Sequence, residues 1–208
     1  MGKGQAEEAE PITPEQARVL FGAIETDRER IYFYTMYGHG FRLNEAIGIN
    51  HGHIRDDRVW LEKGKERKEW APLLAEARDV LLQSGNGADN APVLVGRQGR
   101  VSDSTVQSDI KKWFARAGVR VKRASPHTLR HSFATHLYLA GCDWDAVQLL
   151  MRHKVDGRKV TNRYLHLSPE QRLAKLKGQL ERYSPLRLNG SEPELGEKPD
   201  YTQCQPDV

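Results

Sequence analysis

Residues 125–131 read Ser-Pro-His-Thr-Leu-Arg-His, and this stretch decides how the rest of the chain is interpreted. Ser125 followed by Pro126 is typical of a helix start, because serine caps backbone N–H groups and proline fits the first helical position. His127 and Arg130 lie three positions apart, so both project from one face of the first turn. The N-terminus of a helix also attracts anions. The stretch therefore predicts a phosphate-binding helix start, with a solvated start that carries incidental basic residues as the alternative.

Three further segments carry residues of the same kind. Arg42 follows the glycine turn at Gly40, and Glu45, three positions on, is placed to hold it by a charge-assisted hydrogen bond. A routine surface ion pair, which stabilises little, is the alternative reading. Downstream come residues 151–153, Met-Arg-His, and residues 161–166, Thr-Asn-Arg-Tyr-Leu-His. Each segment is weak evidence by itself, so the order in which they occur carries the argument.

In that order the segments resemble the tyrosine recombinase, or phage integrase, family, either its Xer-like members or a small stand-alone integrase. The family's first box, T-G-x-R-x-x-E, is similar to residues 37–45, Tyr-Gly-His-Gly-Phe-Arg-Leu-Asn-Glu. Its second box, H-x-L-R-H-x-x-A-T, matches residues 127–135, His-Thr-Leu-Arg-His-Ser-Phe-Ala-Thr. The resemblance covers about residues 11–183. It implies the tyrosine recombinase catalytic-domain fold, which is mainly α with a small antiparallel β-sheet (α+β).

The resemblance implies a site-specific DNA recombinase that cleaves and rejoins strands through a 3′-phosphotyrosyl intermediate, without a metal, ATP or other cofactor. Tyr164 would attack the scissile phosphate. Arg42 and Arg130 would clamp its non-bridging oxygens, His127 would move the tyrosine's proton, and His153 would hydrogen-bond the phosphate.

Elementary chemistry agrees with these roles. Tyrosine has a pKa near roughly 10, so it needs a base or strong charge stabilisation to react at neutral pH. The planar arginine fork matches phosphate, and preorganised positive charge stabilises a developing anion.

A lysine in the polar turn of residues 62–68 would protonate the departing 5′-oxygen. Lys65, followed by Lys68 and a Pro-Leu pair, fits the family pattern best, and Lys63 is the alternative. Lys68, Arg152 and Arg163 are expected to contact DNA, and Glu45 to orient Arg42.

The third box departs from the family twice. Met151-Arg152 replaces the usual Leu-Gly before His153, and the interval from His153 to Tyr164 is two residues longer than usual. We assign the extra residues to a polar loop over 154–159, which leaves Tyr164 as the nucleophile.

Local patterns predict the elements around these boxes. Thr13-Pro14 starts the first helix, an apolar stretch covers 31–37, and a short helix carries Tyr164. A hairpin joins strands at 59–61 and 69–71. Further helices are predicted over residues 43–47, 73–83, 105–117, 125–141, 143–151 and 168–183.

Charge is unevenly distributed along the chain. The net charge is +4, but residues 1–10 carry −2 and residues 185–208 carry −3, which leaves +9 on residues 11–184. We expect a disordered leader over 1–10, the catalytic domain over 11–184, and a disordered tail over 185–208. The basic middle fits double-stranded DNA as partner, although an ordinary basic surface would have the same charge.

Several broader expectations follow. We expect a cytoplasmic, nucleoid-associated protein with no membrane partner, monomeric without DNA and a homotetramer on two DNA sites. A metal at His51/His53 or His127/His131 is disfavoured, since no cysteine or carboxylate completes a set. Family members usually carry an N-terminal core-binding domain before the catalytic domain, so the sequence is interpreted either as an excised fragment or as a small stand-alone member. Weak DNA affinity is expected if that half of the DNA clamp is missing. Two rival functions are a non-catalytic DNA-binding protein of the same fold and a type IB topoisomerase-like activity.

Overall fold

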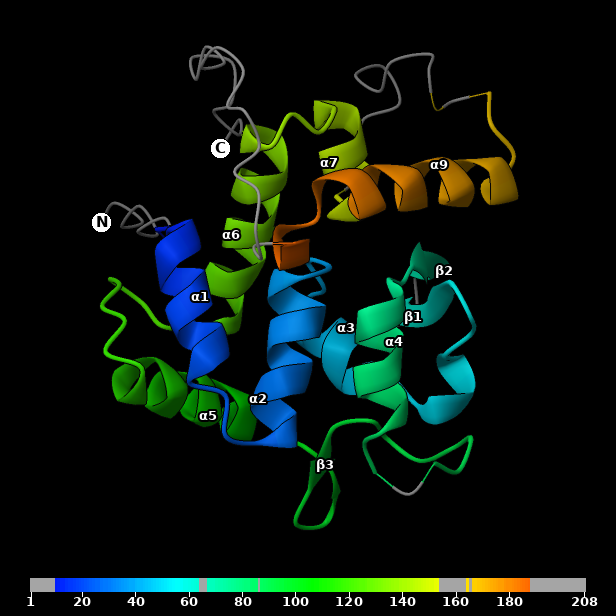
Figure 1. Cartoon of the computed structure of the whole chain (residues 1–208). Helices are drawn as coiled ribbons and strands as arrows, with labels where there is room; N and C mark the ends of the chain where they lie inside the picture. Colours follow the sequence, from blue (N-terminus) through cyan, green and yellow to red (C-terminus); the bar gives the residue numbers. More distant parts are fainter. Residues whose placement is uncertain (1–9, 64–66, 86, 154–163, 165, 188–208) are drawn as a thin grey trace, which may run out of the picture.

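A computed structural model describes residues 10–63, 67–85, 87–153, 164 and 166–187 of the chain. Helix α6 (Pro126–Leu139) lies between the N-terminal helices and the pair α7 and α9 (Figure 1). It begins where the sequence predicts, because the Ser125 hydroxyl accepts a hydrogen bond from the Thr128 backbone N–H and Pro126 occupies the first turn.

The N-terminal part is a run of short helices. These are α1 (Pro14–Gly22), α2 (Asp27–Tyr32), the π-helix η1 (Phe33–Tyr37), α3 (Leu43–Gly48) and the 3-10 helix η2 (His51–His53). Helix α1 starts where predicted, with a capping box between Thr13 and Gln16, and an equivalent pair, Thr26 and Glu29, starts α2. Helix α2 passes directly into η1, and η1 packs beside α6.

The predicted hairpin forms from β1 (Arg58–Lys63) and β2 (Arg67–Pro72), with Trp60 opposite Trp70. Its strands are longer than predicted, and Lys63 and Lys68 therefore lie in strands and not in the turn. Next come α4 (Ala75–Leu82), a small hairpin that the sequence did not predict, and α5 (Asp103–Arg116). The unpredicted hairpin pairs β3 (Val95–Gly96) with β4 (Gly99–Arg100).

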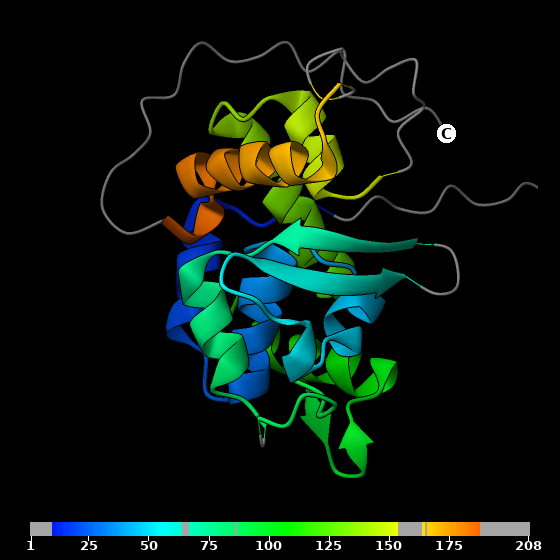
Figure 2. The ribbon, with the colours of Figure 1, turned by 90° about the vertical axis from the view of Figure 1, so that its right-hand side faces the viewer.

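The C-terminal part contains α7 (Trp144–Leu150), α9 (Pro169–Tyr183) and the 3-10 helix η3 (Pro185–Arg187). Figure 2 shows α9 lying along the β1–β2 hairpin. The prediction of a disordered tail from residue 185 is wrong for its first three residues, because Leu186 packs against the hydrophobic core. The leader over 1–9, the loop over 154–159 and the tail from 188 lie outside the described residues.

Two hydrophobic clusters make the core. The larger one joins the N-terminal helices, the β1–β2 hairpin, α4 and α5. The smaller one joins α6, α7 and α9, and it contains Phe133, Met151 and Tyr164. The predicted class, mainly helical with small antiparallel sheets, is confirmed. Within the described ranges, no helix combines the length and apolar character needed to cross a membrane.

Candidate active site

The turn that precedes Arg42 depends on Gly40. Its φ of +62° lies in the left-handed region, and a Cβ there would meet the Phe133 ring at 2.3 Å. Only glycine lets the chain turn this closely against α6. The turn therefore brings the Gly40 carbonyl next to the arginines of the second and third boxes.

We expect Gly40→Ala to destabilise the fold by about 2–4 kcal/mol, since it combines a left-handed backbone penalty with overpacking against Phe133. Urea unfolding measures the change. Gly118→Ala is the matched control, because Gly118 also has a positive φ (+68°) but no atom lies within 4 Å of its Cβ position. The control isolates the backbone penalty of about 1–2 kcal/mol. Equal losses for the two variants would show that the Phe133 contact does not matter.

Arg130 connects the three boxes from inside the protein. Its side chain is 7% exposed. One terminal nitrogen donates to the Gly40 carbonyl and the other to the Met151 carbonyl. A buried guanidinium with fixed partners has little freedom to rotate. Arg130 therefore fixes the start of α6, the Gly40 turn and the Met151 turn relative to one another.

Arg42 is held by Glu45 in the way the spacing suggests. The Glu45 carboxylate accepts from the Arg42 backbone N–H at 2.7 Å and from its guanidinium at 2.8 Å. The second terminal nitrogen of Arg42 donates to the Arg152 carbonyl at 2.8 Å. Glu45 is almost fully buried, whereas the Arg42 side chain is 27% exposed. The Arg42 guanidinium is thus held through both terminal nitrogens and is still partly open to a ligand.

Electrostatics favour an anion at this place. Burial alone would raise the pKa of Glu45, but the charge and hydrogen bond of Arg152, followed by the hydrogen bonds of Arg42, outweigh burial and hold the pKa at about 2. Burial, followed by the charges of Arg152 and Arg42, lowers the pKa of Arg130 from its usual value to about 9. The guanidinium groups of Arg42, Arg130 and Arg152 thus face a single carboxylate, that of Glu45.

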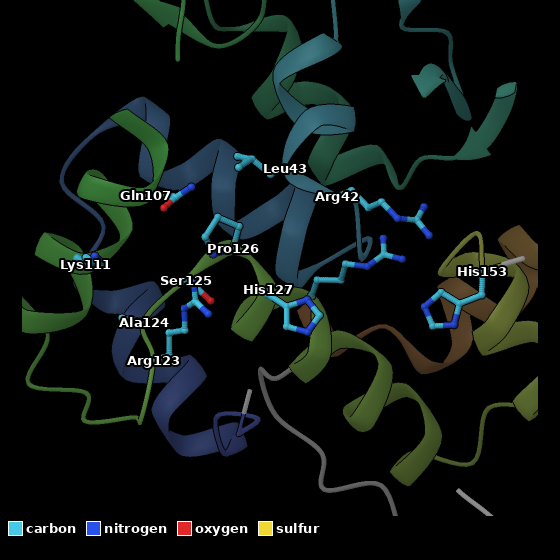
Figure 3. Close-up of a pocket in the computed structure, with 11 residues that line it drawn as sticks. Arg42, Leu43, Gln107, Lys111, Arg123, Ala124, Ser125, Pro126, His127 and His153 are labelled. Carbon is cyan, nitrogen blue, oxygen red and sulfur yellow. The ribbon is translucent and has the colours of Figure 1, made fainter. Parts of the chain in front are cut away.

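Arg42, His127, Arg130 and His153 line one pocket with a volume of about 460 Å³. Figure 3 shows Arg42, His127 and His153 directed toward a common space, from three separate segments of the chain. Residues that the sequence analysis missed extend the pocket toward α5: Gln107, Lys111 and Arg123. The only sequence signal for them was their basic or polar type near the second box, and spacing alone does not bring α5 to the start of α6.

His127 lies in the first turn of α6, at the wall of the pocket. Partial burial, and then the charges of Arg130 and Arg123, lower its pKa below the usual 6.5. The imidazole is therefore neutral at pH 7 and able to accept a proton.

Tyr164 does not line this pocket. Its side chain is 1% exposed and packs in the smaller hydrophobic cluster with Phe133 and Met151. The Lys175 ammonium lies 4.5 Å from the centre of its ring. Since Phe133 and Met151 also contact Gly40, this cluster directly adjoins the arginine site.

The other predicted residues fall in different places. Lys65 and Arg163 lie outside the described residues. Lys63 ends β1, and Lys68 in β2 is well exposed and pairs with Glu62 at 3.0 Å. Arg152 was expected on a DNA-facing surface, but its side chain is 6% exposed and binds Glu45. The Arg152 side chain lies in the interior because it donates two hydrogen bonds to the buried Glu45 carboxylate.

The histidine pairs do not form a metal site in the described part of the chain, where no group of three or more metal-ligating side chains occurs. His127 and His131 stack with ring centroids 6.5 Å apart. His39, in the first box, accepts a hydrogen bond from the Leu74 N–H and contacts the Tyr34 carbonyl. It ties the end of the hairpin to the π-helix, which is a structural role.

Comparison with known proteins shows which family shares this sequence. A model described as the phage integrase family matches residues 10–171. The chain belongs to this family. Tyrosine recombinase XerD of Brucella abortus is 36% identical over 153 residues, covering 68% of this chain and 48% of the relative. Tyrosine recombinase XerC of Rhodospirillum centenum is 33% identical over 157 residues, covering 71% and 45%. The chain thus spans about half the length of the curated relatives it matches.

Solved integrase structures share the fold. The integrase from mycobacterium phage Brujita superimposes with a TM-score of 0.68 at 22% identity, covering 91% of this chain and 63% of that one. The lambda integrase catalytic core gives a TM-score of 0.56 at 19% identity and is covered over 95% of its length by 69% of this chain. XerH recombinase bound to its difH substrate gives 0.59 at 19% identity, covering 70% and 46%. The predicted catalytic-domain fold of tyrosine recombinases is therefore confirmed.

Proposed function

We propose that this phage integrase family member is a site-specific DNA recombinase that cuts and rejoins DNA through a covalent link to Tyr164. The observation that carries the proposal is the pocket that brings Arg42, His127, Arg130 and His153 together from three segments. A non-catalytic DNA-binding protein has no need for two inward-facing arginines and two histidines at one anion site.

In the proposed reaction, the Tyr164 phenol oxygen attacks the scissile phosphorus while His127 takes the phenol proton. The bond from phosphorus to the 5′-oxygen breaks, and Lys65, or Lys63, gives that oxygen a proton. Arg42 and Arg130 bind the non-bridging oxygens, whose negative charge grows in the transition state. His153 adds a hydrogen bond to the same phosphate. Rejoining reverses these steps, so the bond energy is conserved in the phosphotyrosyl link without ATP or a metal.

Tyr164 has to leave its packed position before it can attack. Its ring lies in the hydrophobic cluster beside the arginine site and not within the pocket. We propose that DNA binding selects a conformation in which the phenol enters the pocket between Arg42 and His127. The state described here is then unable to cleave DNA, which keeps the nucleophile protected until a substrate is bound.

Double-stranded DNA is the proposed partner. XerH recombinase, a structural neighbour, was solved bound to its difH substrate, and the Tn1549 transposon integrase in complex with a circular intermediate DNA. Residues 11–184 of this chain carry a net charge of +9, which suits such a partner. Lys68 and Arg163 are proposed to contact the phosphate backbone of the DNA. Lys111 and Arg123, which line the far end of the pocket, are proposed to do the same. We further propose a monomer without DNA, a tetramer on two sites, and a cytoplasmic, nucleoid-associated location.

A nicked-duplex assay tests the proposal. The nick lies a few nucleotides from the attacked phosphate, so cleavage releases a short strand and traps the protein on the DNA. The assay uses a library of nicked duplexes, so that many target sequences are sampled. We expect a protein–DNA adduct on a denaturing gel that protease digestion removes. Tight DNA binding with no adduct from any duplex would instead favour the non-catalytic protein, and relaxation of a plasmid without a recombination site would favour a topoisomerase.

A further inference from the structure

Arg152 has an unusual backbone conformation. Its φ is +51°, and it is the only non-glycine residue with a positive φ in the described ranges. Residues with a Cβ adopt this left-handed region at a cost in conformational energy, which a glycine would not have. The side chain of Arg152 must therefore make interactions that compensate for the backbone strain.

Those interactions all lie in the interior. The Nε and one terminal nitrogen donate to Glu45 Oε2 at 3.1 and 2.8 Å. The same terminal nitrogen donates to the Gly40 carbonyl at 2.9 Å, and the other donates to the Leu150 carbonyl at 2.6 Å. The guanidinium also lies 4.9 Å from the centre of the Phe41 ring. Its donors thus join the first box to the turn that ends α7.

The backbone around Arg152 holds the two phosphate-facing arginines. The Arg152 carbonyl accepts from Arg42, and the Met151 carbonyl accepts from Arg130. His153, which lines the pocket, is the next residue. Any shift of Arg152 would therefore move the partners of both arginines and displace His153.

Arg152 also competes with Arg130 for Glu45. One terminal nitrogen of Arg130 lies 3.8 Å from Glu45 Oε2, the oxygen that Arg152 occupies. Three guanidinium groups surround this one carboxylate, which leaves an excess of two positive charges. Without Arg152, Glu45 would attract Arg130 away from the pocket, and the excess would fall to one.

We propose that Arg152 is a positioning residue. It occupies the acceptor Glu45 Oε2 with its own hydrogen bonds and links the Gly40 turn to residues 150–153. In this way it keeps Arg130 and His153 directed at the phosphate. This rests on the proposed recombinase function. The excess charge matches the phosphate, whose negative charge increases in the transition state, so Arg152 acts more on the rate of cleavage than on DNA affinity.

Arg152→Gly tests this role, because glycine relaxes the backbone while removing the guanidinium. Arg97→Gly is the matched control, since Arg97 is exposed in the β3–β4 turn and its loss also removes one positive charge. With saturating nicked duplex, we expect Arg152→Gly to form the adduct about 10- to 100-fold more slowly, as small misplacements of catalytic groups do. DNA affinity should fall no more than in the control, and Arg152→Lys should recover part of the rate. A wild-type rate for Arg152→Gly, or an equal loss of rate in Arg97→Gly, would overturn the inference.

Acid unfolding gives a second readout that needs no DNA. Arg42, Arg130 and Arg152 all face Glu45, and His39 lies near Arg152 with its pKa lowered by burial to about 4. Because the pKa of Glu45 is depressed, its stabilisation is present above pH 4.5 and is lost as the pH falls toward 2. Without Arg152 that pKa rises, so the ratio of the variant's unfolding constant to that of the wild type should shrink by roughly threefold to tenfold from pH 6 to pH 3. The ratio for Arg97→Gly should stay constant.

The two readouts separate the possible failures. If the wild type forms no adduct but the ratio of unfolding constants still shrinks at low pH, the proposed function is overturned and Arg152 is a purely structural residue. If the wild type is active, Arg152→Gly is equally active and the ratio of unfolding constants does not change with pH, only the inference about Arg152 is overturned.

Discussion

Replacing Tyr164 by phenylalanine is expected to abolish the covalent protein–DNA adduct, lowering its rate of formation by about 10⁴-fold or more. The change removes only the oxygen that would bond to phosphorus. The ring keeps its place in the hydrophobic cluster with Phe133 and Met151, beneath Lys175. Unfolding free energy should change by about 1 kcal/mol, the ordinary effect of one buried hydroxyl. Loss of the adduct would then reflect chemistry and not unfolding.

The measurement compares adduct yield on the nicked duplex that the wild type cleaves best, together with the urea midpoint of each variant. Tyr183→Phe is the control, because Tyr183 ends α9 in the same part of the fold. We expect it to form the adduct at the wild-type rate. An adduct that persists in Tyr164→Phe and disappears in Tyr183→Phe would reassign the nucleophile to Tyr183.

The helix boundaries were predictable wherever a local signal was strong. Ser125-Pro126 starts α6, Thr13-Pro14 starts α1 and Ser168-Pro169 starts α9, because the capping groups lie within a few residues of each other. The ends of the β1–β2 strands were less predictable, since they depend on cross-strand pairing. The short β3–β4 hairpin has only two residues in each strand, which is too few for an alternating pattern to be seen.

The joining of the site residues was not predictable from spacing. Arg42 and Arg130 are 88 positions apart, and the resemblance to a family, not periodicity, placed them together. The structure gives the physical reason: both arginines bind carbonyls of the same buried turns. Lys111 and Arg123 were missed because their approach to the pocket depends on how α5 packs.

Arg152 shows where sequence reasoning reaches its limit. Arginine is mostly exposed in proteins, so a DNA-facing surface was the reasonable expectation. The burial of Arg152 depends on the carboxylate of Glu45, more than a hundred positions away in the sequence. It also depends on a positive φ, which no local sequence pattern predicts. The replacement of the family's glycine was visible in the sequence, but its consequence was visible only in three dimensions.

The Arg130→Lys variant is expected to slow adduct formation by about 10²- to 10³-fold, the usual loss when one preorganised donor to a transition-state anion is removed. Lysine keeps the charge but not the planar fork, so it is unable to bind the Gly40 and Met151 carbonyls and the phosphate together. A buried carbonyl left without its donor should also destabilise the fold by about 1–3 kcal/mol. Single-turnover cleavage well below the unfolding midpoint measures the rate, and urea unfolding measures the stability.

Arg42→Lys is the companion variant that separates the two effects. Arg42 is 27% exposed while Arg130 is 7% exposed, so water can solvate the groups that Arg42→Lys leaves behind. We expect both variants to lose a similar share of the cleavage rate, but only Arg130→Lys to lose substantial stability. Equal stability losses would mean that Arg130 is no more central to the packing of the three boxes than Arg42. A wild-type cleavage rate in Arg130→Lys would remove Arg130 from the phosphate clamp, because the remaining charge would then be sufficient without the geometry of the guanidinium.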